Sequence, residues 1–537
     1  MTDLNFITQT KKLIDSLKSV CANYGLGNDG NEFKIITQVF LYKFINDKFV
    51  YEIKKESEIL KNAENFQEAL EAIGEEEYQF LLSFVNADTP QIKAHQTITY
   101  LHNRQNKPEF AKLFDDTLRE ISIQNTAIFS VKSSSGAKNK MFDELSNFIS
   151  DSSQRDNFCK ALISKLFEFS FEHMFSEKYD FFATIFEYLI KDYNTDSGGK
   201  YAEYYTPHAV ARIMAAILVT DKVQNVKCYD PSAGSGTLLM NIAHAIGEEN
   251  CSIYCEDISQ KSSNMLRLNL VLNNLSHSIP HIIKGNTIAE PYYRDNKFDY
   301  IVSNPPFKLD FSDFSASLDT DINKSRFFAG IPNVPKTKKE SMAIYLLFIQ
   351  HIMHSLSTKG KAAIVVPTGF ITAQSGIEKN IREALVKRNM LRGVVSMPSN
   401  IFASTGTNVS ILFLDKQSDS EHIVLMDASK LGETVKDGKN QRTVLTFDEE
   451  ARIINVFNEK RAEEDFSVVV TAAEVEAKNY SLSAGQYFEV KIEYTDITAD
   501  EFKAKMNGFE SSLADLFKES NALELKIEEA LKGLRYD

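Results

Sequence analysis

Apolar residues recur every three or four positions through the first third of the chain, with charged residues between them. The spacing is clearest over residues 6–24, 32–61 and 110–123. Such a period gathers the apolar side chains on one face of a helix. The pattern therefore predicts a helical domain over residues 1–165, packed as a bundle.

Short apolar runs replace that period in the middle of the chain. Residues 226–229, 252–255 and 298–303 are each typical of a buried strand. The first run leads into a loop of small residues and then a helical pattern over 238–246, which is the opening unit of a doubly wound sheet. We therefore predict an α/β domain with a doubly wound sheet over residues 166–420.

The remainder, residues 421–537, is predicted to be an extension that ends in a long helix. Thr446 and Glu449 have the spacing of a capping box, which predicts a helix over 446–457. Over residues 505–535, apolar positions follow alternating steps of four and three, which form a heptad seam that one helix cannot bury alone. The seam consists of Phe509, Leu513, Leu516, Ser520, Leu523, Ile527, Ala530 and Leu534. This helix either folds back on its own domain or docks on a partner.

Composition narrows the function classes. Asp and Glu outnumber Lys and Arg by 74 to 60 in 537 residues, a formal net charge of −14. Because affinity for duplex DNA depends on Lys and Arg at the phosphates, we expect the chain alone to bind double-stranded DNA weakly. No apolar run approaches the length of a membrane span and the first residues are unlike a signal peptide, so we expect a cytoplasmic protein without membrane contact.

Cysteine and phosphate-loop patterns exclude two further classes. Five cysteines without a Cys-x-x-Cys pair favour a reducing compartment. Cys251 and Cys255 have no accompanying histidine cluster, and we predict no metal site. The sequence contains no G-x-x-x-x-G-K-S/T loop, so it is not a nucleotide-driven motor subunit.

Asn304, Pro305, Pro306 and Phe307 directly follow the strand predicted at 298–303. The Asn304 amide oxygen and the Pro305 carbonyl are two acceptors for one planar amino group. Pro306 holds Pro305 extended, and neither proline has an N–H that competes. Two acceptors draw the lone pair of a bound amine out of conjugation, and the Phe307 ring suits stacking of an unstacked base. An ordinary Asn-Pro turn after a strand is the alternative.

The loop after the strand at 226–229 is predicted to bind a cofactor. Its candidate contacts are Asp230, Gly234, Ser235, Gly236 and Thr237. The glycines allow a ligand close to the backbone, and the free N–H groups of the next helix favour a negative group. A dinucleotide fingerprint needs a third glycine where this chain has Leu239, which favours S-adenosylmethionine over a nicotinamide cofactor. Glu256, after the next strand, is the predicted acceptor for both ribose hydroxyls, and Asp257 is predicted to cap the following segment.

These motifs together resemble the amino-group DNA methyltransferases that act on adenine. More narrowly, residues 180–416 resemble the modification subunit of type I restriction-modification systems. Matching runs at 360–367, 381–385 and 394–407 imply the remaining strands and helices, ending at 409–414. The family usually has an acid where this chain has Asn286, which is still predicted to accept a hydrogen bond from the cofactor's adenine amine.

The resemblance also places a short stretch against the methionine end of S-adenosylmethionine. The stretch consists of Glu203, Tyr204, Tyr205, Thr206, Pro207 and His208. Thr206 is predicted to be the N-cap and Pro207 the first residue of a helix that runs to residue 217, which presents free N–H groups to a carboxylate. The tyrosine rings suit the sulfonium, since aromatic faces attract cations.

The resemblance implies direct methyl transfer to the N6 amino group of a flipped adenine, in a specific DNA sequence. Ser303 stands where a cytosine C5 enzyme would have its cysteine nucleophile, so no covalent intermediate is expected. The implied partners are a DNA specificity subunit at the C-terminal helix, a second copy of this chain and a restriction/translocase subunit. The alternatives are a stand-alone enzyme acting on RNA or protein glutamine, a nicotinamide oxidoreductase, and an inactive assembly subunit.

Residues 309–339 follow the Asn-Pro-Pro-Phe quartet and form a long insertion. It carries Arg326, Phe327 and Phe328, and a basic stretch at 336–339. Two interpretations remain open from the sequence: a clamp on a flipped nucleotide or its strand, and a solvated surface insertion.

Overall fold

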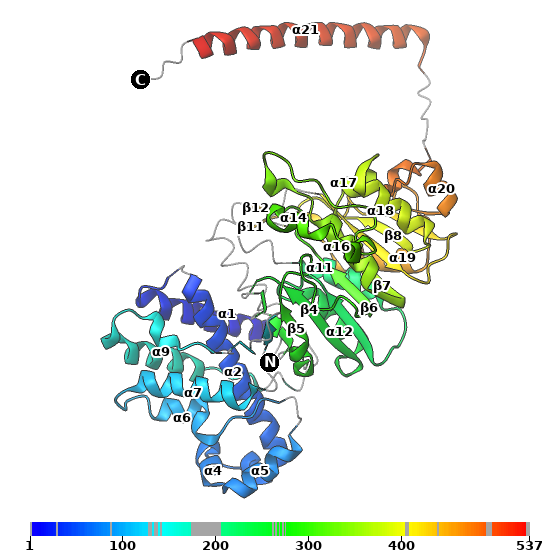
Figure 1. Ribbon diagram of the computed structural model, residues 1–537. Helices are drawn as coiled ribbons and strands as arrows, with labels where there is room; N and C mark the ends of the chain where they lie inside the picture. The colour runs from blue at the N-terminus through cyan, green and yellow to red at the C-terminus, as the bar shows by residue number, and fades with distance from the viewer. Residues whose placement is uncertain are drawn as a thin grey trace. The chain divides into compact units, whose positions relative to one another are not determined.

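The computed structural model describes most of the chain (Figure 1). The described residues are 3–27, 30–85, 89–126, 142–172, 206–259, 275–402, 408–437, 440–489 and 497–532, with Phe175 and short pieces within 131–139 and 262–273. Residues up to 487 form one compact unit, and residues 488–537 form a second.

The N-terminal region is helical, as predicted, and Figure 1 draws it in blue and cyan. Its longer helices are α1 (Asp3–Asn23), α2 (Gly30–Glu56), α5 (Glu75–Phe84), α7 (Phe110–Gln124) and α9 (Arg155–Phe167). The shorter ones are α3 (Glu58–Lys61), α4 (Phe66–Ala72) and α6 (Ile98–Asn103). Ile36, Phe40 and Phe114 are fully buried between these helices, because their apolar stripes face one another.

The doubly wound sheet is confirmed. Its central strands are β3 (Val226–Asp230), β4 (Cys251–Asp257), β5 (Ile282–Lys284), β6 (Phe298–Ser303), β7 (Leu356–Pro367), β8 (Leu391–Ser396) and β9 (Val409–Asp415). They lie in the order β5-β4-β3-β6-β7-β9-β8. All neighbours are parallel except β9, which runs antiparallel to both β7 and β8.

Helices cover both faces of this sheet. α11 (His208–Leu218) and α12 (Thr237–Ile246) pack on one face with Cys228 and Ile253. α16 (Tyr345–Ser355) lies on the other face, where its His351 ring meets Tyr229. Because side chains alternate along a strand, Cys228 and Tyr229 project to opposite layers, which explains the continuous apolar runs of the central strands.

The sheet extends past the predicted domain boundary at residue 420. β10 (Ile423–Asp427) pairs in parallel with β8, and β13 (Ser467–Val470) pairs antiparallel with β10. The boundary at 420 is therefore wrong, because it separates strands that share backbone hydrogen bonds. At the opposite edge, β1 (Val131–Ser133) joins β5, and β2 (Lys138–Asn139) joins β1.

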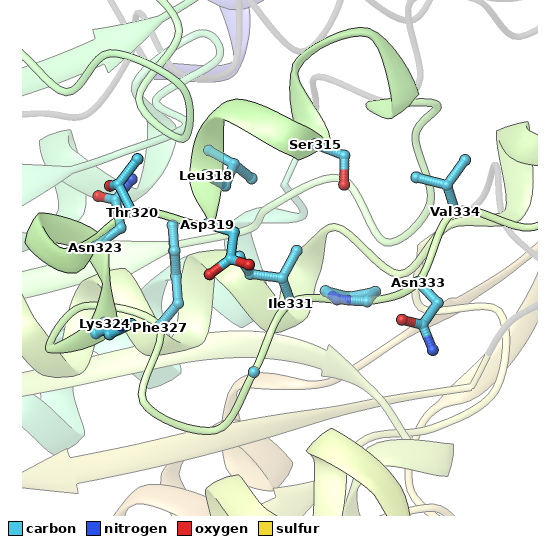
Figure 2. Close-up of a pocket in the computed structure, with 12 residues that line it drawn as sticks. Ser315, Leu318, Asp319, Thr320, Asn323, Lys324, Phe327, Ile331, Asn333 and Val334 are labelled. Atoms are coloured by element: carbon cyan, nitrogen blue, oxygen red, sulfur yellow. The ribbon is translucent and has the colours of Figure 1, made fainter.

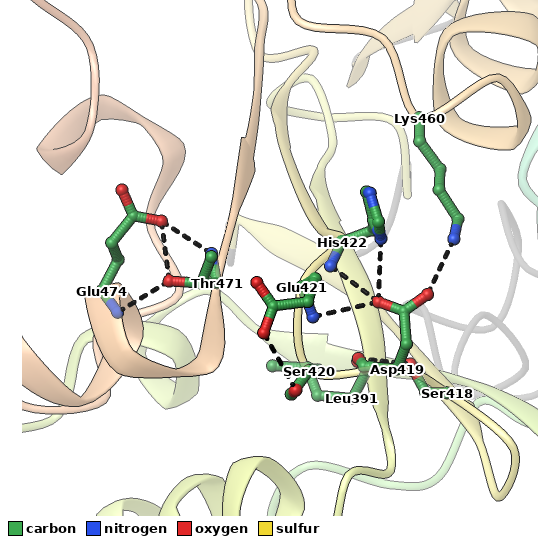
Figure 3. A network of polar contacts seen from close by, with 9 residues as sticks. All are labelled: Leu391, Ser418, Asp419, Ser420, Glu421, His422, Lys460, Thr471 and Glu474. Atoms are coloured by element: carbon green, nitrogen blue, oxygen red, sulfur yellow. Dashed lines mark hydrogen bonds and ion pairs between the residues drawn. The ribbon is translucent and has the colours of Figure 1, made fainter.

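A polar network fixes the chain where it enters β10 (Figure 3). One carboxylate oxygen of Asp419 accepts hydrogen bonds from the backbone N–H groups of Glu421 and His422, at 3.0 and 2.8 Å. The other oxygen accepts from Lys460 Nζ at 3.1 Å. Burial opposes these bonds, yet they lower the pKa of Asp419 to about 2. The carboxylate thus stays ionised and ties β10 to the segment after α19 (Phe447–Asn458).

Two capping boxes complete this part of the fold. Thr446 and Glu449 form the predicted box at the start of α19. Thr471 and Glu474 form an equivalent one at the start of α20 (Ala472–Ala477), as Figure 3 shows. The small helices α17 (Gly369–Thr372) and α18 (Gly376–Lys387) lie between β7 and β8 in sequence, and β11 (Glu433–Asp437) with β12 (Asn440–Val444) forms a separate hairpin.

Among the described residues of the second unit, 488–489 and 497–532, the one helix is α21 (Ala499–Lys532). The predicted C-terminal helix is confirmed, although it begins earlier than residue 505. Its apolar side chains are exposed, with Leu516 60% and Leu523 51% accessible. Leu534 of the predicted seam lies outside the described residues. None of the helices described here combines the length and apolar character that crossing a bilayer requires.

Candidate active site

The Asn-Pro-Pro-Phe quartet lies at the carboxyl end of β6. Asn304 is half-buried, Pro305 is buried and Pro306 is exposed. Asn304 Nδ2 donates to Thr206 Oγ1 at 3.2 Å. This bond holds the amide nitrogen toward Thr206, so the amide oxygen of Asn304 is the atom of this group that can accept a further hydrogen bond. The contact joins the catalytic quartet to the stretch that the sequence assigned to the cofactor.

Thr206 does not have its predicted capping role. The first residue of α11 is His208, Pro207 is the N-cap with ψ at 137°, and no side chain caps the helix. The predicted N-cap at Thr206 and first helical position at Pro207 are therefore wrong by one residue. Thr206 is buried and its hydroxyl serves Asn304 instead. Glu203, Tyr204 and Tyr205 lie outside the described residues.

The glycine loop joins β3 to α12 beside the quartet. Gly234 and Gly236 have φ values of +54° and +84°, a region that favours glycine. A Cβ built on Gly236 would lie 2.2 Å from Leu266 Cδ1. Glycine at position 236 therefore leaves room for the Leu266 side chain, and the loop ends at Thr237, where α12 begins with its free backbone N–H groups. That geometry suits the close approach of a cofactor to main-chain N–H groups.

Asp230 supports this loop from inside. Its carboxylate is 1% exposed and accepts the Ser232 N–H at 2.9 Å. The Ser232 hydroxyl in turn lies 2.7 Å from the Ser303 hydroxyl, which directly precedes the catalytic quartet. Burial raises the pKa of Asp230 to about 7, against the hydrogen bonds that lower it. Asp230 therefore links the cofactor loop to β6.

Glu256 is turned away from the loop, contrary to its predicted role. The side chain is 0% exposed, Oε2 accepts from the Tyr229 hydroxyl at 2.7 Å, and Oε1 accepts from Tyr292 N at 2.7 Å. Neither oxygen remains accessible to a ribose. The reason is the alternation of side chains along β4. Asp230 pairs with Cys255, so these two side chains lie on the same face of the sheet. Asp257 is two residues after Cys255 and shares that face, whereas Glu256 projects from the other face.

Asp257, and not Glu256, is the carboxylate that contacts the glycine loop. Its Oδ2 accepts the Gly234 N–H at 2.9 Å, so the carboxylate touches the glycine loop. Oδ1 accepts the Ser259 N–H at 2.7 Å, in keeping with the predicted cap. The sequence analysis assigned Asp257 only a capping role. The alternation of side chains along β4, once its pairing with Asp230 is known, indicates that Asp257 faces the glycine loop.

Asn286 follows β5 and forms a local turn. Its Oδ1 accepts the N–H groups of Ile288 and Ala289, both at 3.1 Å. Next to it, the Thr287 hydroxyl donates to the Pro231 carbonyl at 2.7 Å. The turn is thereby attached to the glycine loop, and the predicted contact of Asn286 with the cofactor's adenine stays a prediction.

Phe307 is half-buried and held by an aromatic row. Its ring meets Tyr345 edge to face at 6.3 Å, and Tyr345 meets Phe370 in the same manner at 6.2 Å. Such contacts restrain the rings of large side chains. The partly open Phe307 ring therefore has a supported orientation at the end of β6.

The 309–339 insertion packs against α16 and the segment after β5. Leu309 N donates to Met342 O at 3.1 Å, which closes its base, and α14 (Ser312–Leu318) and α15 (Asp321–Lys324) lie within it. An apolar cluster joins Phe311, Leu318 and Phe327 of the insertion to residues outside it, which are Ile288, Met342, Ile344, Leu347 and Phe348. Arg326 is 1% exposed, so this side chain is not available as a clamp on a nucleotide. The insertion is also more than a solvated surface loop, because it has buried residues of its own.

The insertion also forms a half-open pocket of about 360 Å³, drawn in Figure 2. Leu318, Phe327 and Ile331 supply apolar walls, and Ser315, Asp319 and Thr320 supply polar ones. Lys336, Lys338 and Lys339 are exposed beyond it.

The strand order and the two loops at neighbouring strand ends define the class of protein. The glycine loop follows β3, and the Asn-Pro-Pro-Phe quartet follows the adjacent β6. Ligands bind in doubly wound sheets at the carboxyl ends of such strands. The chain is an S-adenosylmethionine-dependent methyltransferase, and the positive-φ glycines at the N-terminus of α12 fit that cofactor.

Comparison with known proteins defines the family. The N-6 DNA Methylase family matches residues 177–496. The methylase subunit of the type I restriction enzyme MpnII of Mycoplasma pneumoniae is 28% identical over 380 residues, covering 67% of this chain and 68% of that protein. The methylase subunit of the MjaIX enzyme of Methanocaldococcus jannaschii is 26% identical over 396 residues, covering 70% of this chain and 67% of that protein.

A solved structure has the same fold. The type I restriction-modification methyltransferase subunit from Streptococcus thermophilus covers 91% of this chain and 100% of its own, with 20% identity and a TM-score of 0.70. Since the family match spans more than half of the sequence, the chain belongs to the N-6 DNA methylases. It is an adenine-specific DNA methyltransferase with S-adenosylmethionine as the methyl donor.

Proposed function

We propose that this chain is the methylation subunit of a type I restriction-modification complex. In this role it transfers a methyl group to the N6 amino group of a flipped adenine within a specific DNA sequence. The observation that carries the proposal is the bond from Asn304 Nδ2 to Thr206 Oγ1, which orients the amide oxygen at the end of β6. The family match and the similar type I methylase subunits support DNA adenine over RNA or protein glutamine.

The quartet acts on the target amine. The Asn304 amide oxygen and the Pro305 carbonyl accept its two N–H groups, so the nitrogen lone pair leaves conjugation with the ring. S-adenosylmethionine, when bound, supplies the methyl group to that lone pair and leaves as S-adenosylhomocysteine. The amine nitrogen then loses one proton to solvent. Phe307 stacks on the extruded base and keeps it in the site.

The cofactor is assigned to the loops around β3 and β4. Glu203, Tyr204, Tyr205, Thr206, Pro207 and His208 are proposed for the methionine end. The loop Asp230–Thr237 is proposed for the central part, because it turns at two glycines with positive φ and ends at the N-terminus of α12. Asp257, rather than Glu256, is proposed for the ribose hydroxyls, since its carboxylate touches the glycine loop. Asn286 is proposed for the adenine amine.

Replacement of Asp257 by Asn should weaken S-adenosylmethionine binding. A ribose hydroxyl loses a charged acceptor, and hydrogen bonds to charged groups contribute about 1.5–3 kcal/mol. Asp299→Asn is the matched control. Asp299 also accepts a backbone N–H, from Lys227 at 3.0 Å, but it lies at the start of β6, whereas the proposed site is at the end of that strand. Calorimetric titration of both variants measures the difference. Equal affinities would remove Asp257 from the ribose site.

Replacement of Phe307 by Ala should impair handling of the extruded base. Loss of one base–aromatic stack costs about 1–3 kcal/mol. Duplexes with a mismatch at the target adenine flip more readily and should recover part of that loss. Methylation rates on matched and mismatched duplexes test this expectation, and an equal loss on both would argue against stacking on this ring.

The proposed partners are a DNA specificity subunit, a second copy of this chain, a restriction/translocase subunit and double-stranded DNA. The names of the similar proteins place them in type I restriction enzymes, which supports an assembly of this kind. The exposed apolar side of α21 is proposed to dock on the specificity subunit. The exposed lysines of the 309–339 insertion are proposed to contact DNA phosphates.

The function is tested by reconstituting the chain with the specificity subunit of its own system. Tritiated methyl groups should enter the DNA fraction, and sequencing for N6-methyladenine should return one recognition sequence. The Asn304→Ala complex is the control and should leave that sequence unmethylated. Label in RNA or in protein glutamine, with unmodified DNA, would overturn the proposal.

A further inference from the structure

A row of buried polar side chains connects the insertion to the end of β4. Arg326 Nε donates to His351 Nδ1 at 3.0 Å, and His351 Nε2 lies 3.1 Å from the Tyr229 hydroxyl. The Tyr229 hydroxyl donates to Glu256 Oε2 at 2.7 Å. All four residues are buried, and none belongs to the catalytic quartet.

The protons in this row have one consistent arrangement. Because Arg326 has only donors, His351 Nδ1 must accept and His351 Nε2 must carry the proton. That N–H then donates to Tyr229, whose own proton goes to the Glu256 carboxylate. Burial, followed by the charge of Arg326, holds the pKa of His351 well below its usual value, so the imidazole is neutral. Burial raises the pKa of the Glu256 carboxyl group, against the hydrogen bond from Tyr229 and the charge of Arg326, which lower it. A buried cation and a buried carboxyl group are thus joined through two neutral side chains.

Arg326 and Glu256, the first and last residues of the row, both form hydrogen bonds with the same loop. Arg326 Nη1 donates to Ile288 O at 2.9 Å and Nη2 donates to Thr287 O at 2.5 Å, directly after Asn286. Glu256 Oε1 accepts the N–H of Tyr292 at 2.7 Å. The loop from 286 to 292 is therefore attached at its beginning by a residue of the insertion and at its end by a residue of β4.

We propose that Arg326 and Glu256, joined through His351 and Tyr229, are positioning residues that hold the 286–292 loop in the conformation that binds the cofactor's adenosine. The inference rests on the proposed function, which assigns Asn286 to the adenine. It also gives the insertion after the catalytic quartet a direct connection to the cofactor side of the site. A loop that leaves this conformation lowers the apparent affinity in proportion to the lost population.

The mildest test removes one hydroxyl from the middle of the row. Tyr229→Phe should raise the calorimetric Kd and the KM for S-adenosylmethionine by about fivefold or more, with kcat at saturating cofactor little changed. Tyr293→Phe is the matched control. Tyr293 packs against Tyr229 and Phe298, but its hydroxyl donates to His281 O at 2.8 Å, outside the row. Its Kd should equal that of the wild type.

A double-mutant cycle tests the two ends, which do not touch. Arg326→Met leaves the Glu256 carboxylate buried without a countercharge and should raise the Kd by about tenfold or more. Adding Glu256→Gln to Arg326→Met should lower the Kd again by several-fold. If the two residues acted independently, the free-energy losses of the single variants would add instead. In protein labelled with ¹⁵N-histidine, the His351 signal should report a neutral ring protonated at Nε2.

The outcomes separate this inference from the proposed function. Wild-type protein that does not bind S-adenosylmethionine would contradict the function itself. Wild-type binding with equal affinities for Tyr229→Phe and Tyr293→Phe would overturn the positioning role, as would an Nδ1-protonated His351. If Arg326→Met fails to fold, the tyrosine pair decides, because both variants remove only a hydroxyl.

Discussion

Asn304→Ala should abolish methyl transfer while leaving S-adenosylmethionine affinity nearly intact. The amide oxygen of Asn304 acts on the target amine as its charge develops, and loss of one such preorganised group costs about 100- to 1,000-fold in kcat. The cofactor is assigned to other loops, so its binding should change little. Calorimetry and tritium transfer on the same reconstituted complex measure the two effects.

Thr206→Val provides a graded comparison for this prediction. The variant keeps the Asn304 side chain but removes the hydroxyl that accepts from Asn304 Nδ2. Its rate should fall by less than that of Asn304→Ala, because the amide oxygen is present but poorly oriented. Large loss of cofactor affinity in Asn304→Ala, with partial activity retained, would mean that the roles of the quartet are misassigned.

Charged substitutions on α21 should disable the assembled enzyme without unfolding the catalytic unit. Leu516→Glu with Leu523→Glu places two carboxylates on the heptad seam, where both side chains are more than half exposed and available to a partner. Since the chain carries a net charge of −14, its DNA binding should depend on the specificity subunit. The double variant should therefore not co-purify with the specificity subunit. It should also neither shift DNA in a gel nor methylate DNA.

The matched control places the same charges on the opposite side of the helix. The control variant is Ala514→Glu with Asn521→Glu. Each of these residues precedes one of the leucines by two positions, a rotation of 200° around an α-helix. This variant should assemble and methylate normally. Efficient methylation by the isolated wild-type chain, or assembly of the Leu516/Leu523 variant, would refute the assignment of α21.

Several features were predictable from sequence because they depend on local chemistry. The Asn-Pro-Pro-Phe quartet, the glycine loop and the capping box at Thr446 each need particular residue types at a short spacing. The heptad pattern predicted α21 for the same reason, since helical periodicity is set by adjacent turns. The short apolar runs in the middle of the chain predicted the doubly wound sheet, which the structure confirms.

Other features depend on residues far apart in sequence. Glu256 and Asp257 are adjacent carboxylates, and only the pairing of β4 with β3 decides which of them faces the glycine loop. The bond between Thr206 and Asn304 joins positions 98 residues apart, so no local propensity indicates it. The strands after residue 420 join the sheet through β8, which is likewise invisible in their own sequence.

Arg326 shows the same division between sequence and tertiary structure. In sequence it is one cation beside two phenylalanines, in a long insertion whose pattern is compatible with an exposed clamp. Folding buries it, because two backbone carbonyls and His351 satisfy its donors and Glu256 balances its charge through the row. The sequence by itself determined which chemical groups were available and the secondary structure that carries them. Only the tertiary structure decided which groups meet, since strand parity and long-range burial are properties of the packed sheet.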